Sequence, residues 1–470
     1  MSKSEAKKRA VRQAQKPAKA PRERKPLSRR AKLTLLITAV VLVAAVLTVG
    51  LVLRSRAMRR ARTTIVGFYD ITDAQQKAVQ AVLERTFSAL PEVQAASAGA
   101  AEAAASADAA DAELSESSAD SSAEDAPILE FITLTDDEAA DPKLTKKIDV
   151  LITQTGALTT SLMTEAAAES AEIAARFPRT TQSSPYFSLD GQFVVMPLFL
   201  DHFESAYYTI LRDDLSAVLP ASLTEFAEYA DRARESVTYP IIASGADDTV
   251  LFAMVSALAE SVAGAEGYQQ LVNELSFIAQ KGYSFDRALE IPLKGDAPSG
   301  LTFGDILQVF TNWRNEGLIL GDWYETGEKT MGVFMEDYHT GIVEMMLSQH
   351  RRMPYPAIKY YDSAQFPADT SVNRALIAPS VSYMYFNRTI ATDAFAAALS
   401  SADEQEYLSV QTQLAPTTLR GQSFDRQADD VRYMAATNAG GPVPDLGTAA
   451  FQNTARRAGF AEWIRGLLRE

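Results

Sequence analysis

Polar and aromatic side chains follow several predicted strands of this sequence, at the points where those strands end. Each of these positions carries a hydroxyl, carboxylate, amide or imidazole group: Tyr69, Asp70, Gln154, Thr155, Asp201, His202, Ser244, Asp247, Asp337, Tyr338 and Tyr383. Because the carboxyl ends of parallel strands gather at one edge of a sheet, we expect these groups to converge on one cleft. Aromatic faces surrounded by acids and amides suit a sugar, whose C–H faces stack while its hydroxyls need hydrogen-bond partners.

Structural roles compete with this ligand role at the same positions. Tyr338 and Tyr383 also suit core aromatic residues with a hydrated hydroxyl. Asp247 also suits the N-cap of a helix that begins near residue 249. The turn at residues 152–156, ITQTG, is the position where ligand contact and a purely structural role are most evenly balanced.

Catalytic and metal-binding patterns are absent from the sequence. It contains three histidines, widely separated, and no cysteine, so no thiolate metal site, cysteine nucleophile or disulfide can form. Phosphate-binding loops, dinucleotide fingerprints and nucleophile elbows are also missing. We therefore expect a protein that is not an enzyme and that holds no cofactor and no metal.

Predicted strands and helices alternate along the chain, which is typical of α/β proteins. Strands are expected at residues 63–70, 127–134, 148–156, 191–197, 205–211, 239–244 and 330–335, with Pro197 ending the fourth. Helices are expected at 71–90 with Thr72 as cap, 222–235, 249–264, 268–282, 301–317 and 339–349. Residues 374–386 are expected to form strands, and two more helices follow up to about residue 414.

The N-terminal region has the charge pattern of a membrane anchor. Residues 1–32 contain 13 lysines and arginines but only two acids, residues 33–53 contain no charge, and five arginines follow by residue 62. A 21-residue apolar run is long enough to cross a bilayer as a helix. A buried core helix and a cleaved signal peptide are the alternatives, but the apolar region of a signal peptide is shorter.

The basic excess before the apolar run predicts the topology of the anchor. We expect residues 1–32 to form a cytoplasmic basic tail and residues 33–53 to form one transmembrane helix that crosses the lipid bilayer of a bacterial cell membrane in a single pass. The rest of the chain is expected to form an extracytoplasmic, periplasmic body. The remaining chain is more acidic than the net charge of −15 implies, so nucleic acid is not an expected partner. Within it, residues 92–127 are rich in Ala, Ser and acids, and we expect a disordered acidic insertion.

The order of motifs over residues 63–420 resembles the extracellular solute-binding proteins of ABC importers, family 1, whose carbohydrate binders include maltodextrin-binding protein. The motifs are IDVLITQTG, GQFVVMP, AYYTILRDDL, YETGEKTM and DAFAAALSSADEQEYLSVQTQLAP. The resemblance implies a two-lobe, type II periplasmic-binding-protein fold. A solute, expected to be a carbohydrate, is trapped between the hinged lobes and delivered to an ABC permease. It places lobe 1 at 63–200 plus 376–400 and lobe 2 at 201–375 plus 401–470.

A second function remains open beside importer-linked solute capture. The retained membrane helix and the thinner aromatic pattern after residue 331 also fit an envelope sensing or interaction module that keeps the fold without transporting a solute. An envelope enzyme would need a catalytic constellation that three scattered histidines do not provide.

Overall fold

The computed structural model describes residues 63–98, 126–208, 219–235, 237–327, 329–330, 343–347, 360–368 and 373–470. All of them belong to the unit Arg62–Glu470. The predicted basic tail at 1–32, the predicted membrane helix at 33–53 and the pair Asp337 and Tyr338 lie outside the described residues.

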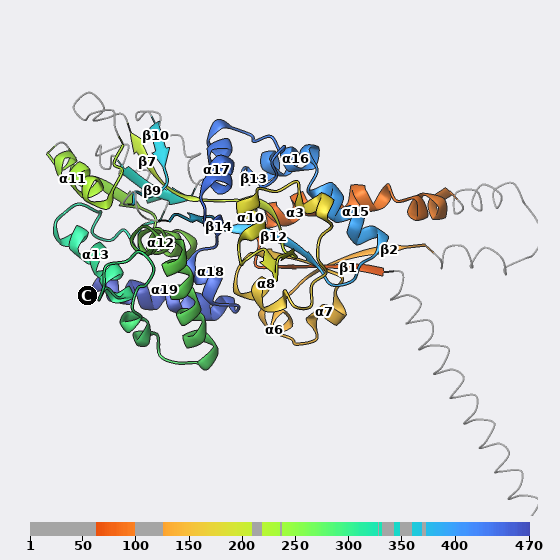
Figure 1. Ribbon diagram of the computed structural model, residues 1–470, viewed down its shortest axis with the longest axis horizontal. Helices are drawn as coiled ribbons and strands as arrows, with labels where there is room; N and C mark the ends of the chain where they lie inside the picture. Colours follow the sequence, from red (N-terminus) through yellow and green to blue (C-terminus); the bar gives the residue numbers. More distant parts are fainter. Residues whose placement is uncertain are drawn as a thin grey trace, which may run out of the picture. The chain divides into compact units, whose positions relative to one another are not determined.

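The first sheet has six strands in the order β13-β6-β12-β3-β1-β2 (Figure 1). They are β1 Thr63–Tyr69, β2 Ile128–Thr133, β3 Val150–Gln154, β6 Met196–Leu200, β12 Ser380–Tyr385 and β13 Ala415–Pro416. β1 pairs parallel with β2 and β3, whereas β12 runs antiparallel to both β3 and β6. The carboxyl ends of β1, β2 and β3 therefore share one edge of the sheet, as the cleft hypothesis requires.

The second sheet has four strands in the order β10-β7-β9-β8. They are β7 Phe203–Tyr208, β8 Ile241–Ala243, β9 Val343–Leu347 and β10 Tyr360–Ala364. β9 corrects the predicted helix at 339–349, because residues 343–347 pair with β7 and β8 instead. Each sheet thus contains strands that are distant from one another in the chain. The chain passes from the first sheet to the second at Asp201 and His202, between β6 and β7.

The boundary between the two sheets differs from the one expected at residue 400. Helix α16, Ala402–Thr412, packs against α3, and β13 pairs with β6, so both belong with the first sheet. The buried Gln405 amide anchors this segment by donating to the carbonyl oxygens of Leu198, at 3.0 Å, and Leu399, at 2.8 Å. Pro197 also differs from expectation, since it lies inside β6, where an irregular register in β12 opposite it accommodates the missing N–H.

Helix α3, Asp73–Ser88, covers the first sheet and begins at the predicted cap. The Thr72 hydroxyl accepts from the Gln75 amide nitrogen, and the Gln75 side chain accepts in return from the Thr72 nitrogen. Residues 91–98 continue as helix, which corrects the start of the predicted disordered insertion at 92–127. Residues 99–125 of that insertion lie outside the described part of the chain.

Helix α12, Asp248–Lys281, joins the two helices that the sequence predicts at 249–264 and 268–282. The left-handed backbone of Gly264, with φ of 69°, marks the break between them. Among the described residues α12 is the one helix long and apolar enough to span a membrane, but 83% of its apolar window is buried inside the protein. It is therefore a core helix of this fold.

The remaining elements are short or peripheral. The helices are α6 Asp136–Ala139, α7 Leu144–Lys147, α8 Ala157–Leu162, α9 Ala171–Ala174, α10 Arg179–Ser183, α11 Leu223–Ala233, η2 Phe285–Glu290, α13 Phe303–Asn315, α15 Ile390–Leu399, α17 Arg426–Thr437, α18 Leu446–Ala450 and α19 Thr454–Arg469. The strands are β4 Ser188–Leu189, β5 Gln192–Phe193, β11 Leu376–Ile377 and β14 Pro442–Val443.

A buried ion pair fastens α12 to the segment that precedes β11. The Glu260 side chain is fully buried and accepts from Arg374 Nε at 3.0 Å and from Nη2 at 2.7 Å. Its other oxygen accepts from the backbone nitrogen of Ala375 at 2.7 Å. This carboxylate therefore ties residues 374 and 375, in the crossover from β10 back to the first sheet, to the core helix through charge-assisted hydrogen bonds.

A second buried acid, Glu169, has no such partner. Both carboxyl oxygens are buried without a hydrogen-bond partner among the described residues. Burial, and to a smaller extent the charge of Asp393, raise the pKa of Glu169 to about 8 against the opposing charge of Arg388. Glu169 is therefore protonated in the folded protein at neutral pH.

This acid predicts that stability falls as the pH rises. Between the ordinary pKa of 4.5 and about 8 the folded state holds a proton that the unfolded chain releases, so the free energy of unfolding decreases across that window. We expect Glu169→Gln to abolish this slope and to stabilise the protein by on the order of 2 kcal/mol above the window. Urea unfolding of both proteins at several pH values tests this, with the exposed neighbour Glu172→Gln as the control. An unchanged slope in Glu169→Gln would contradict the assignment.

Candidate functional site

The ends of β1 and β2 form one wall of the candidate site. Tyr69 is buried, and its hydroxyl donates to Asp136 at 2.7 Å. The Thr454 hydroxyl, at the start of α19, also donates to Asp136, at 2.8 Å. Burial opposes ionisation of Asp136, but these hydrogen bonds outweigh it and lower the pKa of the carboxyl. Asp136 is thus a charged acceptor that joins the strand ends to the last helix.

Asp70 and Arg457 form a two-fold hydrogen-bonded ion pair beside this wall. Arg457 Nη1 and Nη2 each lie 2.7 Å from one Asp70 oxygen, and the two side chains are 16% and 17% exposed. Asp70 has a left-handed backbone, with φ of 54°, which aspartate tolerates better than most residues and which directs the chain from β1 into α3. The geometry fixes both charged groups, so neither is freely mobile at the strand end.

A cavity of about 340 Å³ lies next to this ion pair, and we call it the strand-end cavity. Its polar and aromatic lining comprises Gln154, Asp248, Thr249, Phe252, Thr448, Thr454 and Arg457. Gln154 belongs to the first sheet, whereas Asp248 and Thr249 open helix α12 behind β8 of the second sheet. The cavity therefore lies between the end of β3 in the first sheet and the first turns of α12, which follows β8 of the second sheet.

Helix α18 occupies the space beside the strand-end cavity. A Cβ atom on Gly156 would overlap the carbonyl oxygen of Thr448, and one on Gly447 would overlap the ring of Phe252. The Thr448 hydroxyl donates to Gln154 Oε1 at 3.3 Å. The short helix is thus wedged between the turn after β3 and the start of α12, with room only for glycine at both contacts.

Helix α19 reaches both halves of the fold, and Figure 1 shows it beside α12 and α18. Its first turns contact Asp70 and Asp136 of the first half through Arg457 and Thr454. Further along, the buried Arg465 pairs with Asp248 at 2.6 Å and donates to the carbonyl oxygens of Gly245, Ala246 and Tyr324. One helix therefore bridges the cleft.

The structure gathers part of the predicted site. Gln154 lines the strand-end cavity, and Asp70 adjoins it through its ion pair with Arg457. Asp247 caps the helix whose first residues line the cavity, by accepting from the Thr249 nitrogen at 2.8 Å. Asp337 and Tyr338 lie outside the described residues. The convergence of all these groups on one cleft stays a prediction.

Five further predicted residues do not line this cavity either. Thr155, Asp201, His202, Ser244 and Tyr383 are all buried. The Thr155 hydroxyl bonds with those of Ser380 and Ser382, at 2.7 and 2.5 Å, and the Tyr383 hydroxyl donates to the Thr392 carbonyl oxygen at 2.9 Å. The hydroxyls of Thr155 and Tyr383 therefore stabilise the first sheet around β12.

Several lining residues were not anticipated from the sequence. Phe252, Thr448, Thr454 and Arg457 come from α12 and from the C-terminal helices, and no function was expected for residues 421–470. A turn-rich stretch, GGPVPDLG, followed by an amphipathic helix was the only local signal there. Within the described ranges, no group of three or more potential metal-binding side chains is present.

Comparison with known proteins identifies the fold. No protein-family model matches this chain, and no curated protein matches it in sequence. The bacterial solute receptor AcbH matches 87% of this chain and 94% of its own with a TM-score of 0.58 at 10% identity. The chain has the fold of a two-lobe solute-binding protein.

Two further solute-binding structures agree with this result. The binding protein MsmE from Bacillus subtilis, in an open conformation, covers 87% of this chain and 96% of its own, with a TM-score of 0.55 and 12% identity. RafE from Streptococcus pneumoniae in its apo form covers 86% and 97%, with a TM-score of 0.52 and 10% identity. These neighbours are binding proteins and not enzymes, as the sequence predicts, and at such identities the likeness shows the solute-binding fold alone.

Proposed function

We propose that this protein captures a carbohydrate between its two lobes as the membrane-anchored, extracytoplasmic solute-binding component of an ABC importer. One observation carries the proposal: the end of β3 in the first sheet and the start of α12 behind the second sheet line a single cavity of about 340 Å³. Small-molecule sites occupy roughly 300 to 1,000 Å³, so this cavity holds a small solute.

The lining of the strand-end cavity suits a neutral sugar. Gln154, Thr249 and Asp248 offer an amide, a hydroxyl and a carboxylate to sugar hydroxyls. Solved relatives in fold bind such ligands: AcbH prefers β-D-galactopyranose, RafE has been solved with raffinose, and MalE3 from T. maritima with maltose. A carbohydrate is therefore the solute class that both chemistry and fold favour.

The anchor and the importer are the remaining parts of the proposal. The uncharged run at 33–53, flanked by basic residues, supports a bilayer-spanning helix with the body on the far side of a bacterial cell membrane. Such a body would deliver its solute to an ABC permease in the same membrane. Domain closure around the solute would create the surface that the permease recognises.

Thermal unfolding of the full chain in detergent tests solute capture. We expect one class of sugar from a panel with galactose, maltose and raffinose to raise the melting temperature, because a ligand at about 100 times its Kd stabilises the folded state by about 2.7 kcal/mol. Gln154→Ala should lose the shift, whereas Gln308→Ala, on the exposed face of α13, should keep it. A panel without any shift in the parent chain would overturn the proposal.

A second candidate is an envelope sensing or interaction module that keeps the fold without transporting a solute. The specific observation in its favour is that the protein's own groups already occupy part of the space at the strand ends. Helix α18 lies against Gly156, and Arg457 pairs with Asp70. Cross-linking in membranes separates the two functions. Recovery of a permease supports the importer, and recovery of a signalling or envelope protein in its place supports the module.

A further inference from the structure

A second cavity of about 380 Å³ lies on the other side of α18, and we call it the amide cavity. Its walls are helix α8, the part of α12 that follows Gly264, and the segment from Ala449 to Arg456 that joins α18 to α19. Three carboxamides or hydroxyls on one face of α12 point along it, namely Gln269, Asn273 and Ser276. None of the residues predicted from the sequence to bind a solute lines this cavity.

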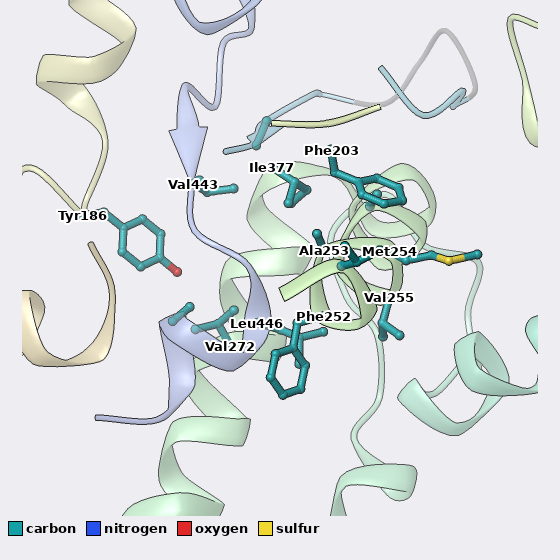
Figure 2. Packing of buried hydrophobic residues seen from close by; sticks show 14 of the residues in the cluster. Tyr186, Phe203, Phe252, Ala253, Met254, Val255, Val272, Ile377, Val443 and Leu446 are labelled. Atoms are coloured by element: carbon teal, nitrogen blue, oxygen red, sulfur yellow. The ribbon is translucent and has the colours of Figure 1, made fainter. Parts of the chain in front are cut away.

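Two buried donors in the lining have no hydrogen-bond acceptor among the described residues. Tyr186 is 3% exposed, and its hydroxyl has no hydrogen bond of acceptable geometry although Gln269 lies nearby. The Nε–H of Arg456 is also buried without an acceptor. Unsatisfied buried donors are costly, and an acceptor brought by a ligand would remove that cost. Figure 2 shows the Tyr186 hydroxyl directed toward the segment that carries Val443 and Leu446.

The Arg456 side chain is held in place before any ligand arrives. Its guanidinium lies 5.2 Å from the centre of the Phe285 ring, and Nη2 donates to the Tyr283 carbonyl oxygen at 3.3 Å. These contacts fix the plane of the guanidinium, so less conformational entropy is lost when a ligand binds. The remaining Nε–H is the donor that lacks an acceptor.

The charge of the amide cavity sets it apart from the rest of the molecule. Its lining contains one cation, Arg456, and no aspartate or glutamate, whereas the chain as a whole has a net charge of −15. Apolar groups from Val272, Ala450 and Phe451 complete the wall. A ligand that fits must carry a negative or acceptor-rich end, hydrogen-bonding groups along its body, and one less polar face.

We propose that the amide cavity binds a small hydroxylated carboxylate of the size of one sugar ring, such as a uronic acid. The carboxylate accepts from Arg456 Nε, and the hydroxyls of the ligand meet the Tyr186 hydroxyl and the side chains of Gln269, Asn273 and Ser276. This site is separate from the strand-end cavity, in which a neutral sugar is proposed, because the two cavities share no lining residue.

Titration calorimetry of the full chain in detergent, with D-glucuronate and D-galacturonate as probes and D-glucose as the neutral counterpart, tests the proposal. We expect the uronates to bind and their affinity to fall at high salt, because the pairing with Arg456 is electrostatic. Arg456→Gln and Tyr186→Phe should each weaken uronate binding, the first by about tenfold or more. Arg85→Gln, which removes an exposed cation far along the chain on α3, should leave it unchanged.

The outcomes separate this site from the strand-end cavity. Uronate binding that survives in Gln154→Ala but weakens in Arg456→Gln supports the proposal, and the melting temperature without ligand shows whether each variant is folded. Equal affinity for glucose and glucuronate in Gln154→Ala, or full uronate binding by both Arg456→Gln and Tyr186→Phe, overturns it, as does the absence of uronate binding in the parent chain. None of these results depends on whether a neutral sugar binds at Gln154.

Discussion

Replacing Glu260 by glutamine is expected to lower the free energy of unfolding by about 3 kcal/mol. The substitution removes the charge that Arg374 faces inside the protein, while the guanidinium, with 21% of its side chain exposed, stays largely desolvated. It also weakens the acceptor of the Ala375 nitrogen. Urea unfolding followed by circular dichroism on the full chain measures the loss.

An exposed ion pair provides the matched control for this experiment. Glu404 pairs with Arg85 on the surface of α16 and α3, with 23% and 48% of the two side chains exposed. Glu404→Gln should cost at most about 1 kcal/mol, because exposed pairs contribute little. Equal losses for Glu260→Gln and Glu404→Gln would show that the buried pair has no special role in holding the crossover.

Gly156→Ala is the second substitution with a large expected effect. Its backbone φ of 162° is extended and suits any residue, so the cost arises from the overlap of the new methyl group with Thr448. We expect a loss of about 1–3 kcal/mol, as for overpacked cores, together with an altered response to sugars because α18 must move. Thermal unfolding with and without ligand measures both effects.

Gly321→Ala is the control for this glycine. A Cβ at Gly321 meets nothing within 4 Å, so the substitution should be close to neutral or slightly stabilising. If Gly156→Ala were as stable as Gly321→Ala, α18 could move away from residue 156 without any loss of stability. Helix α18 would then not be tightly packed between the turn after β3 and α12, contrary to the packing described above.

Local sequence signals predicted most elements of this fold correctly. The capping box at Thr72 fixed the start of α3, and the break of α12 at Gly264 falls where the sequence predicts a gap between two helices. The segment VEMML failed, because Glu, Met and Leu favour helices while pairing with β7 and β8 imposes a strand. A local sequence pattern does not reveal which distant strands will pair with a segment.

The candidate site was predictable only in part, for a topological reason. Tyr69, Asp70 and Gln154 end strands that run parallel, so their position at one edge follows from strand direction. Tyr383 was expected there too, but β12 runs antiparallel to β3 and places Tyr383 opposite Ile152, inside the sheet. Arg457 could not be anticipated, because its contact with Asp70 joins positions 387 residues apart.

The bridge made by α19 has a consequence for how the protein is made. Asp70 leaves the ribosome 387 residues before Arg457, its partner in the ion pair. The nascent chain must therefore keep the end of β1 without this contact until α19 has emerged, and contacts between such distant positions slow folding and expose intermediates to aggregation. Changes within α19 would act on this late step, and folding yield is the property in which we expect them to be visible first.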